Sequence, residues 1–350
     1  MNLRRGLVGL VALIFAVGAW ASDEPKNAFL SDTMGITNGS FLPNVPKPAK
    51  KYKVANITRT LMNAHWVKNK EGFLAACKHY GLDGDVFSVQ DEQQVMDQAN
   101  LLDSVVTKGY DAVIVSPISE KNLLPGLAKA AKKGMKIINV DTARIQEGDA
   151  KANDISIVTF IGSDNYQAGV MALEYVKSKL GDKPGKVACV EGRPGDTVAV
   201  DRTAGFVNTA KKYSNITVAA SQSGQWDRLI ALDVTTNMLR ANPDIMAIYC
   251  NNDTMVLGAL KAATNLGYKV LNSSNVGTEA GKPKTIIIIG NDGIAEALQA
   301  VQDGSLTGTI AQKPFLMGYS AVEAALQALQ GQATSPQTIT PIKLLVQSDF

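Results

Sequence analysis

Short apolar runs alternate with amphipathic segments along most of the chain, from Lys53 onward. The first run, Val54–Thr58, predicts a strand, and the apolar residues at helical spacing after it predict a helix that ends at Gly81. The same alternation predicts five further elements, namely strand Val86–Val89, helix Glu92–Lys108, strand Ala112–Val115, helix Lys121–Lys133 and strand Lys136–Val140. A glycine directly follows each helix, where it takes the left-handed cap conformation without a steric penalty.

A second set of strands repeats this rhythm in the other half of the chain. Apolar runs predict strands over Ile157–Ile161, Val187–Val190, Ile216–Ala220, Ile245–Cys250 and Thr285–Ile289. Runs such as Ala112–Val115 are apolar at every position, which is typical of parallel strands whose two faces are both covered by helices. The pattern therefore predicts an α/β protein with two doubly wound parallel-sheet lobes.

The N-terminal 51 residues do not share this pattern. Residues 1–21 have two arginines, a short apolar run and small residues at the end, the layout of a secretory signal peptide. The apolar run is too short to span a bilayer, which needs about 20 apolar residues. Residues 22–51 contain four prolines and little periodicity, so we expect a proline-rich N-terminal arm. The mature protein is expected outside the cytoplasm, in the periplasm.

Composition excludes several classes of partner and site. The formal net charge is +3, with no basic stripe, so nucleic acid is not an expected partner. Only two histidines occur and neither has metal-ligand spacing, so no metal site is expected. The three cysteines, Cys77, Cys189 and Cys250, are interpreted as buried thiols, although a bridge between Cys189 and Cys250 stays open at this point.

Carboxylates and amides follow the predicted strands at their carboxyl ends. Ligands of open parallel sheets bind at this edge, so these residues are the candidates for a site. They are Asn63, Asp141, Asn252, Asp253, Asp292 and Gln312. Such groups accept from, and in the case of amides also donate to, the hydroxyls of a sugar. Each also fits a helix cap or a turn, and Asp253 in particular is interpreted as a cap.

Other side chains complete the candidate site. Arg59 and Arg202 would donate to the same hydroxyls, and Trp66 and Trp226 offer flat walls for the C–H face of a sugar ring. The tryptophans would equally suit core packing.

Motifs for catalysis and cofactors are absent from the sequence. It contains no Gly-x-Ser-x-Gly, His-Glu-x-x-His or Cys-x-x-Cys, and no dinucleotide fingerprint follows a strand. The segment Gly277–Lys282 lacks the spacing of a phosphate loop and is interpreted as a surface turn. We therefore expect a binding protein without cofactor and not an enzyme, with a sugar-acting Rossmann-type oxidoreductase as the rival hypothesis.

Several longer motifs resemble one known family. They are QWDRLIALDV at 225–234, NPD at 242–244, AIYCNNDTM at 247–255, GNDG at 290–293 and TIAQ at 309–312. From about Lys53 to the C-terminus the chain is similar to the type I periplasmic sugar-binding proteins of ABC transporters, in the ribose and allose group, and most of all to D-allose-binding proteins.

The resemblance implies a division into lobes and a role for each candidate residue. An N-terminal lobe would comprise 52–162 and 313–341, a C-terminal lobe 163–312 and 342–350, and three chain segments would form the hinge between them. The residues that the resemblance places on the sugar are Arg59, Asn63, Trp66 and Asp141 from the first lobe, Arg202, Trp226, Asn252 and Asp292 from the second, and Gln312 at the hinge.

Two departures from the family pattern bear on the ligand. Asp141 is followed by Thr142, where ribose binders carry arginine and allose binders an acidic residue. Ala64-His65 replaces the usual Pro-Phe before Trp66. We therefore expect a monosaccharide, hexose or pentose, with a polyol or an inositol as the alternative in which His65 faces a more polar ligand. The expected partner of this monomer is an ABC permease in the inner membrane, and a chemoreceptor stays open as a further partner at this point.

Overall fold

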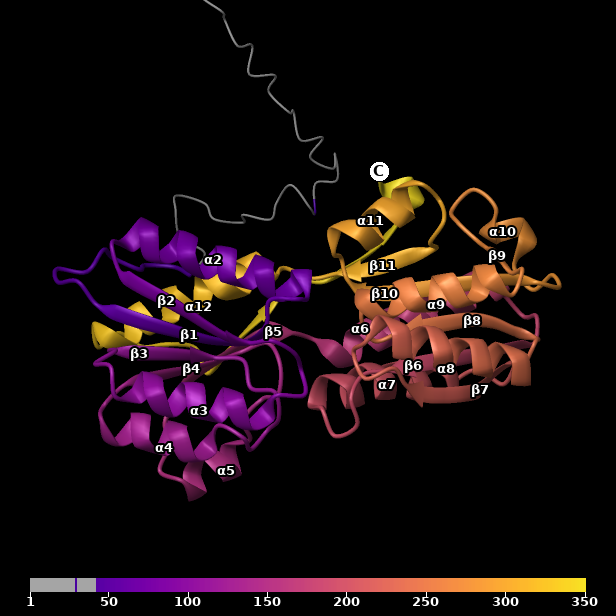
Figure 1. Cartoon of the computed structure of the whole chain (residues 1–350). Coiled ribbons are helices and arrows are strands. Elements are labelled where there is room, and N and C mark those ends of the chain that lie inside the picture. Colours follow the sequence, from indigo (N-terminus) through magenta and orange to yellow (C-terminus); the bar gives the residue numbers. More distant parts are fainter. Residues whose placement is uncertain (1–28, 30–41) are drawn as a thin grey trace, which may run out of the picture.

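The computed structural model describes Phe29 and residues 42–350, which form two lobes, each built on one twisted sheet (Figure 1). The predicted signal peptide, residues 1–21, lies outside the described residues. No helix in the described part of the chain has the length and apolar character needed to cross a bilayer.

The first lobe contains a six-stranded sheet in which neighbouring strands are parallel. Its order is β12-β5-β4-β3-β1-β2. The strands are β1 (Lys53–Thr60), β2 (Asp83–Val89), β3 (Ala112–Val115), β4 (Lys136–Val140), β5 (Ile157–Ser163) and β12 (Gln337–Thr340). The helices of this lobe are α2 (Ala64–Tyr80), α3 (Val95–Val106), α4 (Leu124–Lys132), α5 (Glu147–Ala152) and α12 (Pro314–Leu329).

The second lobe repeats the design. The main path of its sheet is β13-β11-β10-β8-β6-β7, parallel except for the antiparallel pair β11–β13, and β9 pairs with β10. The strands are β6 (Gly185–Glu191), β7 (Ile216–Ser223), β8 (Ile245–Cys250), β9 (Lys269–Val270), β10 (Thr285–Asp292), β11 (Gly308–Ala311) and β13 (Lys343–Val346). The helices are α6 (Asn165–Leu180), α7 (Thr197–Ala210), α8 (Arg228–Ala241), α9 (Asp253–Asn265), α10 (Val276–Glu279) and α11 (Ala295–Gln302), followed by a 3₁₀ turn at Gln347–Asp349.

Apolar residues on both faces of each sheet form the cores. Strands β3 and β10 are buried at every position, as the continuous apolar runs predict. Each sheet has one apolar cluster on each face, so helices cover both sides. The predicted α/β fold with two parallel-sheet lobes is confirmed.

The chain passes between the two sheets three times. It leaves the first sheet after β5, returns after β11 to form α12 and β12, and crosses again between β12 and β13. In Figure 1 the yellow helix α12 therefore lies in the same lobe as the indigo elements β1 and α2. A reading of the alternation of strands and helices alone does not reveal this exchange.

Two smaller features of the sequence are also settled. Cys77, Cys189 and Cys250 are all free and buried, so the alternative of a Cys189–Cys250 bridge is not realised. The described part of the N-terminal arm lies along α12, where the side chains of Gln327 and Gln330 donate to backbone carbonyls of the arm.

Helices α2 and α12 pack with their backbones in contact, because glycines lie at their crossing. A Cβ atom at Gly318 would lie 2.0 Å from the carbonyl oxygen of Asn69, and one at Gly72 would lie 1.9 Å from that of Phe315. No side chain fits in this space without a shift of backbone.

We predict that Gly318→Ala lowers the free energy of unfolding by about 1–3 kcal/mol, the usual cost of overpacking a core. Alanine's higher helix propensity would act in the opposite direction. Denaturant titration measures the change. Gly148→Ala in α5 is the control, because a Cβ atom there meets nothing within 4 Å, and we expect it to raise stability by about 0.4–1 kcal/mol. Equal stability of Gly318→Ala and the wild type would contradict the contact.

Candidate ligand-binding site

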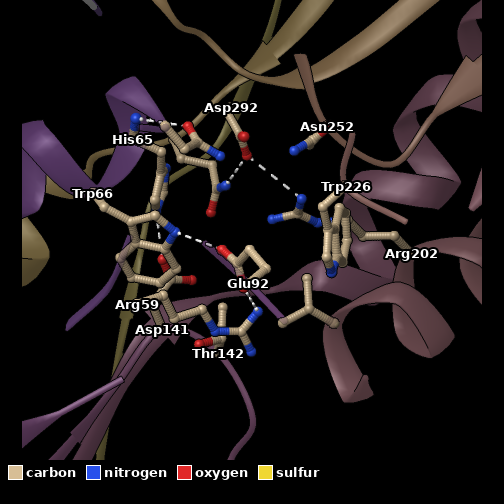
Figure 2. Close-up of a pocket in the computed structure, with 13 residues that line it drawn as sticks. Arg59, His65, Trp66, Glu92, Asp141, Thr142, Arg202, Trp226, Asn252 and Asp292 are labelled. Atoms are coloured by element: carbon tan, nitrogen blue, oxygen red, sulfur yellow. Dashed lines mark hydrogen bonds and ion pairs between the residues drawn. The ribbon is translucent and has the colours of Figure 1, made fainter. Parts of the chain in front are cut away.

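One pocket between the two sheets gathers all ten site residues predicted from the sequence (Figure 2). The empty space within its lining, including the part open to solvent, is about 360 Å³. The predicted residues that line it are Arg59, Asn63, His65, Trp66, Asp141, Arg202, Trp226, Asn252, Asp292 and Gln312. The lining also includes Glu92, Thr142 and Val198, which were not among the predicted site residues.

A histidine–carboxylate pair lines the side of the pocket that belongs to the first lobe. Asp141 follows β4 with a positive φ of 67°, a conformation that aspartate tolerates better than most residues, and its N–H donates to the Ile161 carbonyl at 2.6 Å. The Asp141 carboxylate bonds Nε2 of His65, which lies in the first turn of α2. Both side chains are buried.

The two members of this pair shift each other's ionisation in opposite directions. Burial alone would lower the pKa of His65, but the charge and hydrogen bond of Asp141 outweigh it, so the pKa of His65 is raised. Burial alone would raise the pKa of Asp141, but His65, Arg202 and Arg59 outweigh it, so the pKa of Asp141 is lowered. The charged forms are therefore favoured, with His65 as imidazolium and Asp141 as carboxylate.

Arg59 lies on β1 and is fully buried. Its Nε donates to the Pro117 carbonyl at 2.9 Å, and its Nη1 donates to Asp196 at 2.9 Å and to Glu92 at 3.1 Å. Burial tends to lower the pKa of Arg59, but the two carboxylates raise it. A buried cation here is thus compensated by two acids, as burial of charge requires.

Two tryptophans face the pocket from opposite sides, Trp66 from the first lobe and Trp226 from the second (Figure 2). The Trp66 ring meets the His65 ring edge-on, with centroids 5.0 Å apart. Trp226 follows β7 in a left-handed conformation with φ of 63°. Its ring covers Gly192 so closely that a Cβ atom there would lie 2.1 Å from the indole.

The second lobe contributes a carboxylate held by three donors. Asp292, the last residue of β10, accepts from Gln312 Nε2 at 2.7 Å, from Asn291 Nδ2 at 3.2 Å and from Arg202 Nη1 at 3.4 Å. Arg202, on α7, is fixed in turn by the Asn165 side chain at 2.9 Å. The hydrogen bonds leave these groups little rotational freedom.

Capping and pocket lining coincide at two positions. Asn63 caps α2 and Asn252 caps α9, each accepting from a backbone N–H of its helix, and both line the pocket. Asp253, interpreted as a cap from the sequence, is instead the first residue of α9 and accepts from the N–H groups of Gly293 and Ile294 at 2.7 and 2.9 Å. Burial and the nearby charge of Asp292 raise the pKa of Asp253 to about 7.

The residues of the site that the sequence did not indicate do not directly follow a strand. They lie in the loop after the strand or in the first turn of the next helix. Glu92 follows β2 by three residues and was placed inside a predicted helix, which begins only at Val95. Asp196, which binds Arg59 from behind the pocket lining, follows β6 by five residues and caps α7. The sequence analysis considered only the residues that directly follow each apolar run, so it could not indicate Glu92 or Asp196.

Comparison with known proteins agrees with this architecture. A family model described as "Periplasmic binding protein domain" matches residues 54–333. The chain belongs to this periplasmic binding protein family. Membership confirms the prediction of a solute-binding protein rather than an enzyme.

Several members of the family are similar over nearly the whole chain. The D-allose-binding periplasmic protein of Escherichia coli is 33% identical over 92% of this chain and 98% of its own length. The ribose import binding protein of Bacillus subtilis is 31% identical, over 85% of this chain and 88% of its own. A crystal structure of an Actinobacillus succinogenes periplasmic solute-binding protein with bound D-allose superimposes with a TM-score of 0.76 at 29% identity, covering 85% of this chain and 98% of the other.

We predict that the His65–Asp141 pair stabilises this periplasmic binding protein in a defined pH window. The raised pKa of His65 contributes stability that is complete below the ordinary histidine value of about 6.5 and is lost as pH rises through the raised value. The lowered pKa of Asp141 contributes stability that is complete above about 3.9 and is lost as pH falls through the lowered value.

The measurement compares the free energy of unfolding of the wild type with that of His65→Gln across this range. The glutamine keeps a donor for Asp141 but carries no charge. The wild type's advantage should be largest between about pH 4 and 6.5 and shrink at higher pH. An advantage independent of pH would show that the pair is not ionic.

Proposed function

We propose that this periplasmic binding protein captures one monosaccharide in the pocket between its lobes and presents it to the permease of an ABC importer without chemical change. The E. coli and B. subtilis relatives, named for D-allose and ribose, support a hexose or pentose as the ligand.

The observation that carries the proposal is a set of buried polar atoms in the pocket lining. Arg59 Nη2, His65 Nδ1 and Gln312 Oε1 are buried and have no hydrogen-bond partner among the described residues. Buried polar groups in folded proteins nearly always have a partner, so these atoms indicate what a ligand supplies. They include a donor and an acceptor, and a sugar hydroxyl can pair with either.

Charge narrows the class of ligand. The ionisable groups of the lining are three acids and three bases, Glu92, Asp141 and Asp292 with Arg59, His65 and Arg202. With His65 protonated these charges balance, which favours a neutral sugar over a sugar acid, an amine or a phosphate.

A polyol or an inositol is the second candidate ligand. The observation that favours it is His65, because its ring places a polar edge, already bonded to Asp141, next to the Trp66 wall. A ligand with hydroxyls all around its carbon skeleton would suit this corner better than one with an apolar face.

Closure of the lobes would couple binding to transport. We take the lobes as 52–162 with 313–341 and 163–312 with 342–350, and the three crossings between the sheets as the hinge. A ligand that contacts both lobes stabilises the closed arrangement, and the permease then recognises that arrangement. Residues 1–21 would direct export, in agreement with the E. coli relative, which is named as a periplasmic protein.

We predict that Asp292→Ala weakens sugar binding at least tenfold. The change removes a charged acceptor, worth about 1.5–3 kcal/mol per hydrogen bond, and leaves Arg202 and Gln312 without it. Isothermal titration calorimetry gives the affinity and thermal unfolding confirms the fold. Asp233→Ala, an exposed residue of α8, is the control and should bind as the wild type does. Unchanged affinity in Asp292→Ala would remove Asp292 from the site.

A thermal-shift panel of pentoses, hexoses, polyols and inositols decides between the candidate ligands. A compound that binds only the native protein raises its melting temperature in proportion to affinity and concentration. We expect the largest shift with a pentose or hexose. A larger shift with xylitol or myo-inositol would favour the second candidate, and no shift with any member would contradict the proposed function.

A further inference from the structure

Five side chains form an unbroken chain of hydrogen bonds that links the two aromatic walls. Trp66 Nε1 donates to Glu92 Oε1 at 3.3 Å, and Glu92 Oε2 accepts from Arg59 Nη1 at 3.1 Å. The same Nη1 donates to Asp196 Oδ2 at 2.9 Å, and Asp196 Oδ2 also accepts from Trp226 Nε1 at 3.3 Å. Each indole is thus held by a carboxylate, and both carboxylates bind one guanidinium.

This chain crosses from one lobe to the other at a single bond. Arg59, Glu92 and Trp66 belong to the first lobe, whereas Asp196 and Trp226 belong to the second. The Arg59–Asp196 pair can therefore form only when the lobes are close together. Both side chains are buried, with exposed fractions of 2% and 0%.

Neighbouring contacts fix the same junction. Arg193, in the loop before α7, donates to the backbone carbonyls of Glu92 and Ile118 in the first lobe. Thr197 donates to the carboxylate of Glu120, also across the cleft. The start of α7 is therefore docked on the first lobe by bonds that do not pass through the pocket.

We propose that Glu92 and Asp196 are positioning residues that set the spacing of the Trp66 and Trp226 walls through Arg59, and thereby give a cyclic sugar preference over its open-chain alditol. The inference rests on the proposed function, since it concerns the same pocket.

The physical reason lies in the shape of the two ligands. A sugar ring has two faces and a fixed thickness, so two aromatic walls at a set distance contact both faces at once. An alditol has the same number of carbons but no ring, with one more hydroxyl in place of the ring oxygen, and it loses more conformational entropy when it is confined. Walls held at a fixed spacing therefore raise the affinity for the ring relative to the open chain. Walls that are free to shift raise it less.

The experiment measures affinities for D-allose and allitol, and for D-ribose and ribitol, in the wild type, Asp196→Asn and Glu92→Gln. Asparagine at 196 can keep the cap of α7, because Oδ1 of Asp196 accepts from the Val198 N–H, while an NH₂ group replaces the Oδ2 acceptor of Arg59 and Trp226. Asp227→Asn, the corresponding change at the exposed cap of α8, is the control.

The ratio of sugar affinity to alditol affinity is the decisive quantity. Weaker closure lowers the affinity for both ligands of a pair alike and cancels in this ratio, whereas a change in wall spacing does not. We expect the ratio to fall about fivefold in both Asp196→Asn and Glu92→Gln, the size of one aromatic contact, and to stay constant in Asp227→Asn.

Two results would overturn the inference. Equal losses for sugar and alditol in both variants would mean that the chain of bonds serves closure only, with the proposed function intact. A wild-type protein that binds allitol or ribitol more tightly than the sugars would reject both the inference and the monosaccharide proposal. The wild-type titration therefore tests the function, and the variants test the positioning role.

Discussion

The cleft depends on the neutralisation of one buried guanidinium by carboxylates from both lobes. Isolated in a low-dielectric interior, the charge of Arg59 would be too costly to keep, and Glu92 and Asp196 remove that cost together. Because one acid is local and the other comes from the second lobe, the buried charge of Arg59 is paired with both only in the arrangement of the lobes that this structure shows. The same two carboxylates also accept from the indole N–H groups of Trp66 and Trp226.

The fold delivers these groups because strand ends and helix starts meet at the cleft. Parallel strands direct their carboxyl ends to one edge of each sheet, and the helices that follow need polar caps there. Asn63, Asp196 and Asn252 satisfy that local need and at the same time contribute to the pocket or its support. A capping role and a binding role are thus not competing interpretations in this architecture.

Much of this was predictable from the sequence, and the limits have physical causes. The apolar runs predicted the strands because burial on both faces requires apolar side chains at every position, and the strand-end rule predicted Asp141 and Asp292. The rule missed Glu92 and Asp196, since a loop of three to five residues after a strand can return a side chain to the cleft in ways that spacing does not encode. The site as a functional unit remains a prediction.

The late return of the chain to the first lobe has a consequence for how the protein acquires its structure. Strand β12 completes the first sheet beside β5, and α12 packs on α2, although most of the second lobe lies between them in sequence. Contacts of such long sequence separation are slow to form, because the intervening loop must first be closed. The first segment of the chain already supplies the apolar cluster on one face of the first sheet, whereas the cluster on the other face is completed only when α12 has been synthesised.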